Sequence, residues 1–549
     1  MKKIALLAIG CIAATLLWAK PARRGALVVT QEDGTEAIVY QHGDERFHWT
    51  TNEAGEWIEQ DPNGKWQVVS ALSNEQIQAR REASKFAIAK QTQMRKQAAT
   101  QTAVKTNIAE HGLVILVNFT DMAFKTTQAE MDSMHNGYNY SRDYSYQYNR
   151  ETYTIHAEGS ARQYFYDASF GQYNPKFDVV GPVTVSQKYA YYGANDYNGN
   201  DKHAEQMVYE ACLLVDSLYP EIDFSLYDNN GDGEMDYVYV VYAGFGEADG
   251  GPANTIWPHS YWIQYAGYNL TLDGVKIDKY ACGNEKNAIS KQHDGIGTFV
   301  HEFGHVLGLP DLYATNNTSH RTLGDWDVMD YGTYNNDGNT PPTYSAYERF
   351  FFGWLTPTLI KDTALLTLHD LYSTNEAFLI TTTDEHNLIG TDPNPTTFYL
   401  MENRQSNIWD KYLAGHGMML TKVQYDYNKW YQNTVNNTAS KLGVDIIEAK
   451  TNTSSTNKDT DLFPAGATEY TKISKHPIYN IQETSDGVIQ FKYLSPNATT
   501  SINEVVSSTE NPVVAIYTIT GTPVSLSTPL ASGLYIVKRQ HSTEKVIIR

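Results

Sequence analysis

The stretch GTFVHEFGHVLGLPDLY, residues 297–313, decides how the centre of this chain folds. Apolar residues at helical spacing predict a buried helix, on which His301 and His305 lie one turn apart on the same face. Gly308 is suited to end that helix in the left-handed conformation, and the turn brings Asp311 back toward the histidines. Two imidazoles and a carboxylate leave a fourth position open, as in catalytic zinc sites. We therefore predict that His301, His305 and Asp311 bind Zn²⁺.

Glu302 follows His301 directly, so its carboxylate lies beside the predicted metal. We expect Glu302 to act as the general base that takes a proton from a zinc-activated water and returns it to the leaving amine of a peptide bond. This pattern predicts a zinc metalloendopeptidase. The simpler alternative is a chance pair of histidines on a helix. A different class of function also stays open, in which the chain is a surface adhesin or protein-binding module on an inactive protease scaffold.

The segment GDWDVMDYG, residues 324–332, is a predicted Met-turn. Met329 would lie beneath the metal as an adaptable packing residue rather than as a ligand. Glu348, on a predicted later helix, is an alternative third ligand. Gly308 argues against Glu348 as the ligand. A site completed by Glu348 would not need a glycine and a carboxylate so soon after His305, and it would not need a methionine turn.

The stretch from Gly297 to Tyr313, the Met-turn and the run Tyr347 to Leu355 together resemble the immune inhibitor A family of secreted bacterial metzincins. The resemblance implies a secreted zinc protease with a metzincin-like catalytic domain and a propeptide. It also implies an aspartate as third ligand, where most other metzincins have histidine. By the same resemblance, Tyr331, two residues after the methionine, is a catalytic residue that stabilises the oxyanion.

Residues 228–236, DNNGDGEMD, carry oxygen-bearing side chains at alternate positions around a glycine turn. Ca²⁺ prefers roughly six to eight oxygen ligands, so this loop is a predicted structural calcium site. The loop departs from an EF-hand because its twelfth position is Tyr239. The alternative is an acidic turn that binds no ion. The predicted ligands are Asp228, Asn230, Asp232, the main-chain carbonyl of Glu234, and Asp236.

The composition describes a soluble globular protein with room for three or four domains, since the chain has 549 residues, 41% hydrophobic residues and a mean hydropathy of -0.47. A net charge of -21 would repel phosphate backbones and argues against nucleic-acid binding. The expected partners are protein or peptide substrates.

Residues 1–19 are a predicted signal peptide, because two lysines precede an apolar stretch from Ile4 to Trp18. Cys11 makes a lipoprotein an alternative. We expect export from a Gram-negative cell, to the medium or the cell surface, with no transmembrane helix in the mature chain. Cys212 and Cys282 then remain, and their spacing leaves a disulfide or two free thiols equally open.

Residues 20–105 are a predicted propeptide, made of a small antiparallel β unit and a basic helical linker from Ser73 onward. The alternative is a permanent N-terminal β domain. We expect Arg80 and Arg81 to be exposed to a trypsin-like protease. The region has no cysteine, so a thiol cannot block the zinc. Latency would come from steric blocking or from a carboxylate or imidazole such as Asp44, His42 or His48.

The predicted fold class is α/β (α+β). A catalytic domain over residues 106–357 combines a twisted sheet, including a strand at 112–119, with helices near 160–170 and 204–218, and residues 358–495 form a β-rich domain. Residues 505–549 resemble the C-terminal sorting domain of the type IX secretion system of Bacteroidetes, which implies contact with secretion machinery. A plain terminal β domain is the alternative.

Overall fold

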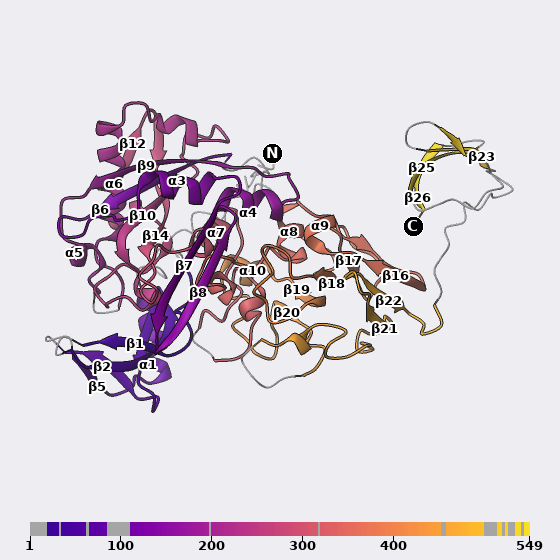
Figure 1. Ribbon diagram of the computed structural model, residues 1–549, viewed down its shortest axis with the longest axis horizontal. Helices are drawn as coiled ribbons and strands as arrows, with labels where there is room; N and C mark the ends of the chain where they lie inside the picture. The colour runs from indigo at the N-terminus through magenta and orange to yellow at the C-terminus, as the bar shows by residue number, and fades with distance from the viewer. Residues whose placement is uncertain are drawn as a thin grey trace, which may run out of the picture. The chain divides into compact units, whose positions relative to one another are not determined.

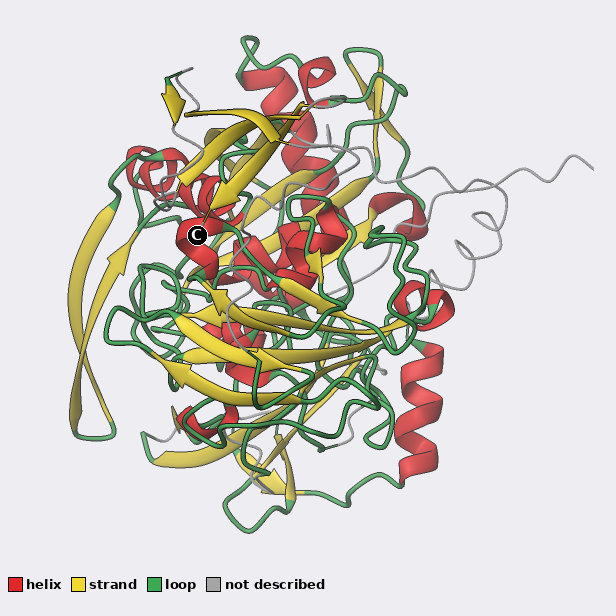
Figure 2. Ribbon diagram, turned by 90° about the vertical axis from the view of Figure 1, so that its right-hand side faces the viewer, coloured by secondary structure: helices red, strands yellow, loops and turns green. Residues whose placement is uncertain are grey.

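The computed structural model describes residues 19–31, 34–61, 65–84, 110–196, 199–316, 319–451, 457–498, 513–518, 522–524, 533–539 and 543–548. The chain divides into two compact units. The first comprises the chain up to Lys361, Leu368–Thr468 and Glu483–Ile489, and the second comprises Asp362–Thr367, Glu469–Gln482 and Gln490–Arg549. Helices and strands are mixed (Figures 1 and 2), which confirms the predicted α/β fold class.

The N-terminal β unit is an antiparallel meander of five strands paired in sequence order. Its strands are β1 (Leu27–Thr30), β2 (Glu36–Asp44), β3 (Phe47–Thr51), β4 (Trp57–Gln60) and β5 (Trp66–Val68). Helix α1 (Asn74–Ala83) follows and begins at a capping box in which Ser73 and Gln76 satisfy each other's backbone N–H groups.

The expectation that Arg81 is exposed is wrong. Its side chain is buried, and its guanidinium donates to the carboxylate of Asp44 and to the main-chain carbonyl of Thr315. Long-range contacts of this kind leave no trace in the local composition of a helix. The rest of the predicted linker, residues 85–109, lies outside the described residues.

A five-stranded sheet, in the order β11-β14-β10-β6-β9, forms the centre of the first unit. Four strands are parallel, and β11 pairs antiparallel with β14 at the edge. The predicted strand at 112–119 is central and buried on both faces, as parallel strands require. The strands are β6 (His111–Asn118), β9 (Lys176–Thr184), β10 (Val238–Phe245), β11 (His259–Trp262) and β14 (Lys279–Lys286).

Helices cover both faces of this sheet. On one face, Val114 and Leu116 belong to the same buried cluster as residues of α4 (Ala161–Ala168) and α7 (Gly297–Val306). The intervening residues of β6 belong to the cluster that includes α6 (Ala204–Leu218). Both predicted helices are therefore present as α4 and α6. The remaining elements of this region are α3 (Gln128–Asn136), α5 (Tyr189–Gly193), a long hairpin of β7 (Ser141–Tyr148) and β8 (Glu151–Glu158), and a short one of β12 (Leu270–Leu272) and β13 (Val275–Ile277).

A second sheet of the first unit, in the order β15-β17-β18-β19-β20, is built from residues after 357. Phe398 and Met419 from this sheet lie in the same buried cluster as Phe303 of α7. Residues on either side of the predicted boundary at residue 358 therefore share one buried core. The elements are α8 (Ala346–Phe352), β15 (Thr358–Leu359), α9 (Leu371–Thr374), β17 (Phe378–Ile380), β18 (Thr397–Arg404), β19 (Gly417–Gln424), α10 (Tyr427–Tyr431) and β20 (Val444–Ile446).

The second unit contains two small sheets, in the orders β16-β22-β21 and β24-β23-β25-β26. The predicted C-terminal strands are present in the latter. The strands are β16 (Ala364–Leu368), β21 (Ile478–Glu483), β22 (Ile489–Tyr493), β23 (Val513–Thr518), β24 (Pro523–Val524), β25 (Gly533–Arg539) and β26 (Thr543–Ile548).

Cys212 and Cys282 are both buried as free thiols, on α6 and β14 of the first unit. Across the part of the chain that the structure describes, no helix has the length and apolar character needed to cross a membrane.

Candidate metal centre

Three side chains converge at one buried point of the first unit. The Nε2 atoms of His301 and His305 are 3.1 Å apart, and Oδ1 of Asp311 lies 3.3 Å and 3.4 Å from them. A tetrahedral ion with ligand distances of about 2.0 to 2.1 Å needs its ligand atoms about 3.3 Å from one another. Among the described residues, this is the one cluster of histidine, cysteine and carboxylate groups with such spacing. The three predicted ligands therefore fit a zinc ion.

Helix α7 supplies both histidines, and the turn after it supplies the aspartate. The helix ends at Val306, and Gly308 has a φ of 106°, in the left-handed region that glycine adopts without strain. The N–H groups of Gly308 and Leu309 return to the carbonyls of His305 and Gly304 at 3.0 Å each. These bonds satisfy the last carbonyls of the helix while the chain reverses, and the reversal brings Asp311 against the histidines.

Main-chain carbonyls orient both imidazoles. Nδ1 of His301 donates to the carbonyl of Val328 at 2.8 Å, and Nδ1 of His305 donates to that of Leu309 at 2.9 Å. Because a carbonyl only accepts, each Nδ1 carries the proton and each Nε2 offers its lone pair to the shared point. Burial lowers the pKa of His305 to about 4, so this ring is neutral at pH 7. A neutral imidazole is the form that binds a metal.

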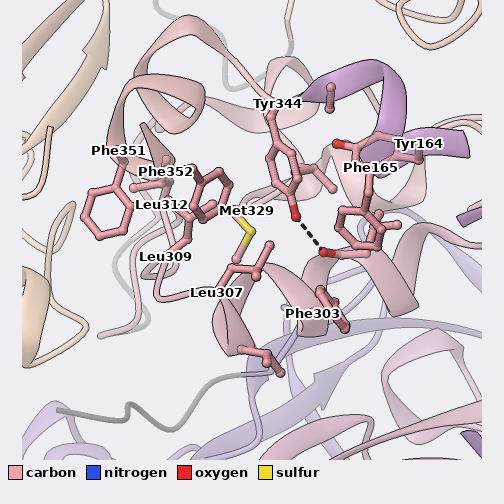
Figure 3. Close-up of a cluster of buried hydrophobic side chains, with 14 of the residues drawn as sticks. Tyr164, Phe165, Phe303, Leu307, Leu309, Leu312, Met329, Tyr344, Phe351 and Phe352 are labelled. Atoms are coloured by element: carbon pink, nitrogen blue, oxygen red, sulfur yellow. Dashed lines mark hydrogen bonds between the residues drawn. The ribbon is translucent and has the colours of Figure 1, made fainter. Parts of the chain in front are cut away.

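The predicted Met-turn packs directly beneath α7. Met329 is fully buried among apolar and aromatic side chains, including Phe352 and Tyr344 (Figure 3). A Cβ added to Gly304, which lies between His301 and His305 on the helix, would be only 2.7 Å from the sulfur of Met329. The glycine therefore permits the close approach of the methionine. The carbonyl of Met329 also accepts from the N–H of Leu312 at 2.8 Å, next to the third ligand.

Asn433, which the sequence analysis did not single out, holds Asp311, the predicted third ligand, in place. Its amide donates to Oδ2 of Asp311 at 2.5 Å, and its side-chain oxygen accepts from the N–H of Asp311 at 2.8 Å. Both residues are buried. Asn433 follows α10 and is distant in sequence from the zinc motif, so no local pattern identifies it. The pair leaves Oδ1 of Asp311 directed at the histidines.

Glu302 is fully buried beside the three ligands. Burial raises the pKa of Glu302 well above its ordinary value, and the nearby Asp311 and Glu45 raise it further. Glu45 is itself buried, in the turn between β2 and β3, and burial together with Asp44 raises its pKa. Oε2 of Glu302 has no hydrogen-bond partner among the described residues. Several buried carboxylates this close together need a cation to balance their negative charge, which is a second reason why zinc fits.

The N-terminal segment 19–24 runs through the same place. The N–H of Lys20 donates to Oε1 of Glu302 at 3.0 Å, and Lys20 is 1% exposed. Tyr313 donates its hydroxyl to the carbonyl of Ala19 at 2.7 Å, and Trp257 donates its indole N–H to the carbonyl of Lys20 at 3.1 Å. Further along, the hydroxyl of Tyr334 donates to the carbonyl of Pro21 at 2.6 Å. The segment therefore covers Glu302.

Tyr331, the residue predicted to stabilise the oxyanion, lies close by, but its side chain contacts Arg24. Its ring is stacked against the guanidinium of Arg24, 3.3 Å from the ring centroid. The rings of Tyr331 and Tyr313 have centroids 6.4 Å apart. Tyr313 is the residue whose hydroxyl contacts a main-chain carbonyl beside Glu302. It lies in the stretch 297–313, but the sequence analysis assigned it no role.

Other predicted candidates lie outside the metal cluster. Asp44 pairs with Arg81, His42 bonds to Thr51, and His48 lies 3.1 Å from Glu247. Glu348 forms the capping box of α8 with Ser345, which accounts for its carboxylate without a metal.

The predicted calcium loop is an exposed turn held by its own carboxylates. Asp228 accepts from the N–H groups of Gly231, Asp232 and Gly233 at 2.8, 3.1 and 2.9 Å. Asp236 accepts from Asn229 and Asn230, and Glu234 pairs with Lys276 at 3.1 Å. These bonds order the loop without an ion, so the calcium site stays a prediction.

Comparison with known proteins agrees with this geometry. Residues 95–354 match the family described as immune inhibitor A peptidase M6, catalytic domain. The chain is 29% identical over 277 residues to immune inhibitor A of Bacillus thuringiensis subsp. alesti, which covers 44% of this chain and 39% of the relative. It is 29% identical over 269 residues to the pre-pro-metalloprotease PrtV of Vibrio cholerae serotype O1, which covers 44% of this chain and 29% of that protein.

The matched segment contains the three metal-binding candidates, Glu302 and the Met-turn, and supports a metalloprotease. The chain spans well under half the length of these relatives. Lys20 and Asn433 lie outside the matched segment, so the contacts that cover Glu302 and orient Asp311 come from the structure alone.

Proposed function

We propose that this protein is a secreted, zinc-dependent endopeptidase that hydrolyses peptide bonds of extracellular proteins. The observation that carries the proposal is the convergence of His301, His305 and Asp311 at tetrahedral spacing with Glu302 beside them. An adhesin built on an inactive scaffold would have no need for a buried base, three oriented ligands and a packed Met-turn.

His301, His305 and Asp311 would hold the zinc ion, which supplies a Lewis acid for a water molecule and a peptide carbonyl. Glu302 accepts the proton of the attacking water, a role that suits a carboxylate whose pKa is raised by burial. It then delivers that proton to the nitrogen of the leaving amine. The hydroxyl of Tyr313 donates to the carbonyl of Ala19, where the carbonyl of a substrate would lie.

We further propose that residues 20–105 act as a propeptide after the leader 1–19 directs export. Residues 20–24 of the prosegment cover Glu302 through the contacts of Lys20 and Pro21, so substrate and prosegment cannot occupy the site together. The β unit adds its own contacts: Arg46 donates to the carbonyl of Thr315 at 2.8 Å, and His48 pairs with Glu247. Latency by this route is steric and involves no thiol.

Two accessory assignments complete the proposal. The loop containing Asp228 and Asp236 would bind calcium and stiffen the entry to β10, on the strength of its clustered oxygen donors. Residues 505–549 would serve as a sorting domain for the secretion machinery, on the strength of the strands β23 to β26.

Digestion of gelatin or casein by protein purified from culture medium tests the enzymatic proposal. We expect hydrolysis that a chelator abolishes and zinc restores. Glu302→Ala should abolish hydrolysis while it retains one bound zinc, whereas Glu221→Ala, at an exposed position of the first unit, should behave as the wild type. Unchanged digestion by the Glu302 variant would exclude the proposed chemistry. Mass spectrometry of active protein should place the mature N-terminus near residue 106, and one near residue 20 would refute the propeptide.

A further inference from the structure

Segment 19–24 is held in part by main-chain contacts that any polypeptide could make. The main-chain N–H of Lys20 meets Glu302, and the flanking carbonyls of Ala19 and Lys20 accept from Tyr313 and Trp257. None of these bonds depends on the side chains of the segment. A substrate would therefore find the same donors and acceptors, and the segment shows how a bound polypeptide lies in the site.

The position of Lys20 relative to Glu302 identifies the part of a substrate that Lys20 represents. In the proposed mechanism, Glu302 gives its proton to the nitrogen that leaves. The nitrogen within hydrogen-bond distance of Glu302, at 3.0 Å, is that of Lys20. In this structure Lys20 thus occupies the place of the residue that follows the cleaved bond, and Ala19, the last residue of the predicted leader, occupies the place of the residue before it.

The side chain of Lys20 enters a buried acidic pocket. Its Nζ lies 2.7 Å from Oδ1 of Asp249, 2.8 Å from Oγ1 of Thr298 and 3.9 Å from Oδ2 of Asp294. It also lies 5.0 Å from the ring centroid of Tyr334. The side chains of Lys20 and Asp249 are each 1% exposed. The ammonium group is therefore fully desolvated and bound by two carboxylates, a hydroxyl and an aromatic face.

The pocket is built independently of the lysine. The amide of Asn284, on β14, donates to Oδ2 of Asp249 at 3.0 Å, and the hydroxyl of Thr298 donates to Asp294 at 2.8 Å. Thr298 is on α7, one turn before His301, so the pocket and the metal ligands share one rigid helix. Burial and the charge of Asp249 raise the pKa of Asp294 to about 7. When the prosegment leaves, the pocket keeps an unbalanced negative charge that a cationic side chain would neutralise.

The size of the pocket favours lysine. Asn284, Asp294 and Thr298 also line a cavity of about 20 Å³, which is room for about one water molecule. The longer and planar guanidinium of arginine would have to extend into this cavity and contact the carboxylates in a different geometry. A neutral side chain would leave Asp249 without its partner.

We propose that Asp249, Asp294 and Thr298 form the specificity pocket for the residue that follows the cleaved bond, and that they select substrates with lysine there, with arginine second. The inference rests on the proposed peptidase function and adds a substrate class to it. The lysine of the prosegment occupies the pocket in the latent protein.

Internally quenched peptides that differ only at the residue after the cut test this pocket in the processed protein. With Lys, Arg, Met and Glu at that position, we expect kcat/KM for Lys to exceed that for Met by about 100-fold or more, because a buried hydrogen-bonding site strongly rejects an analogue without the matching group. Mass spectrometry of the products locates the cut. Zinc-dependent hydrolysis without a preference for basic residues would overturn this inference and leave the proposed function intact.

Two variants separate the pocket from general loss of structure. Asp249→Asn and Thr298→Val should each lower the ratio of the Lys to the Met rate by about 10-fold or more. Asp216→Asn, at an exposed position of α6, is the matched control and should leave the ratio unchanged. A Lys to Met ratio unaltered in both pocket variants would refute the assignment.

Binding to an inactive variant gives a readout that does not depend on turnover. In Glu302→Gln, calorimetry should show the Lys peptide bound about 100-fold more tightly than the Met peptide, and Asp249→Asn added to it should reduce that difference. Equal affinities would overturn the inference. If the wild type hydrolyses no peptide while the Lys peptide binds selectively, the proposed function fails and the basic-residue pocket stands.

Discussion

Asn433→Ala is the sharpest test of the metal centre, because both hydrogen bonds of the Asn433 side chain are to Asp311. The substitution removes a hydrogen bond of 2.5 Å to Oδ2 of Asp311 and one of 2.8 Å from its N–H. Both partners are buried, so no bulk water replaces the lost amide. The carboxylate then rotates more freely and presents Oδ1 to the histidines less often.

The magnitude follows from the bond to the charged oxygen. A hydrogen bond to an ionised group contributes about 1.5 to 3 kcal/mol, and about 1.4 kcal/mol corresponds to a factor of ten. We expect zinc affinity to fall about 10- to 100-fold, as is typical when the outer contacts of a metal ligand are removed. Competition with a chelator, followed by elemental analysis, measures the affinity. At saturating zinc, kcat should recover to within a few-fold of the wild type.

The matched control is Asn428→Ala, an exposed asparagine on the neighbouring α10. It should leave zinc affinity unchanged. If Asn433→Ala binds zinc as tightly as the wild type while its fold and thermal stability are preserved, the positioning role assigned to Asn433 is wrong. If zinc at saturation fails to restore kcat, the residue has a role beyond the metal.

Three further outcomes are expected. Tyr313→Phe should lower kcat about 100-fold with little change in KM, because it removes a donor to the substrate carbonyl; equal effects on both constants would contradict this. Added CaCl₂ should raise the Tm of the wild type but not that of Asp228→Ala, and an equal rise in both would argue against calcium at this loop. Burial opposes protonation of His48, but Glu247 at 3.1 Å outweighs it and raises the pKa of His48. The contribution of His48 to prosegment binding is therefore complete below about pH 6.5 and is lost as the pH rises through its raised pKa. Limited proteolysis of the proform should accordingly become faster as the pH rises. The variant His48→Gln should remove this pH dependence.

Local sequence was enough for those parts of the site whose geometry depends on one element. The spacing of His301 and His305 on a helix and the glycine after it require only backbone geometry, and the structure has α7 end at Val306 with Gly308 in the left-handed region. The buried strand β6 and the helix α6 were equally predictable, since an apolar run and a 3.6-residue period are local signals. The mixed α/β class follows from their alternation.

The failures concern contacts between distant parts of the chain. A basic residue on a polar helix is usually exposed, yet Arg81 is buried against Asp44 because the β unit docks beside Thr315. The boundary expected at residue 358 stays a prediction, but residues of α7, β18 and β19 on either side of it share one buried cluster, which composition does not reveal because it reports local structure.

The amino-acid sequence by itself determined the candidate metal site of this protein, because His301, Glu302, His305 and Asp311 are set by residue types at helical spacing within seventeen consecutive positions. Only the tertiary structure decided what surrounds that chemistry. Lys20 is 282 residues from Glu302, and Asn433 is 122 residues from Asp311. Such pairs meet because hydrophobic burial folds the N-terminal segment and the later sheet onto one core. Many weak contacts together bring these segments into place, and no short stretch of the chain encodes that sum.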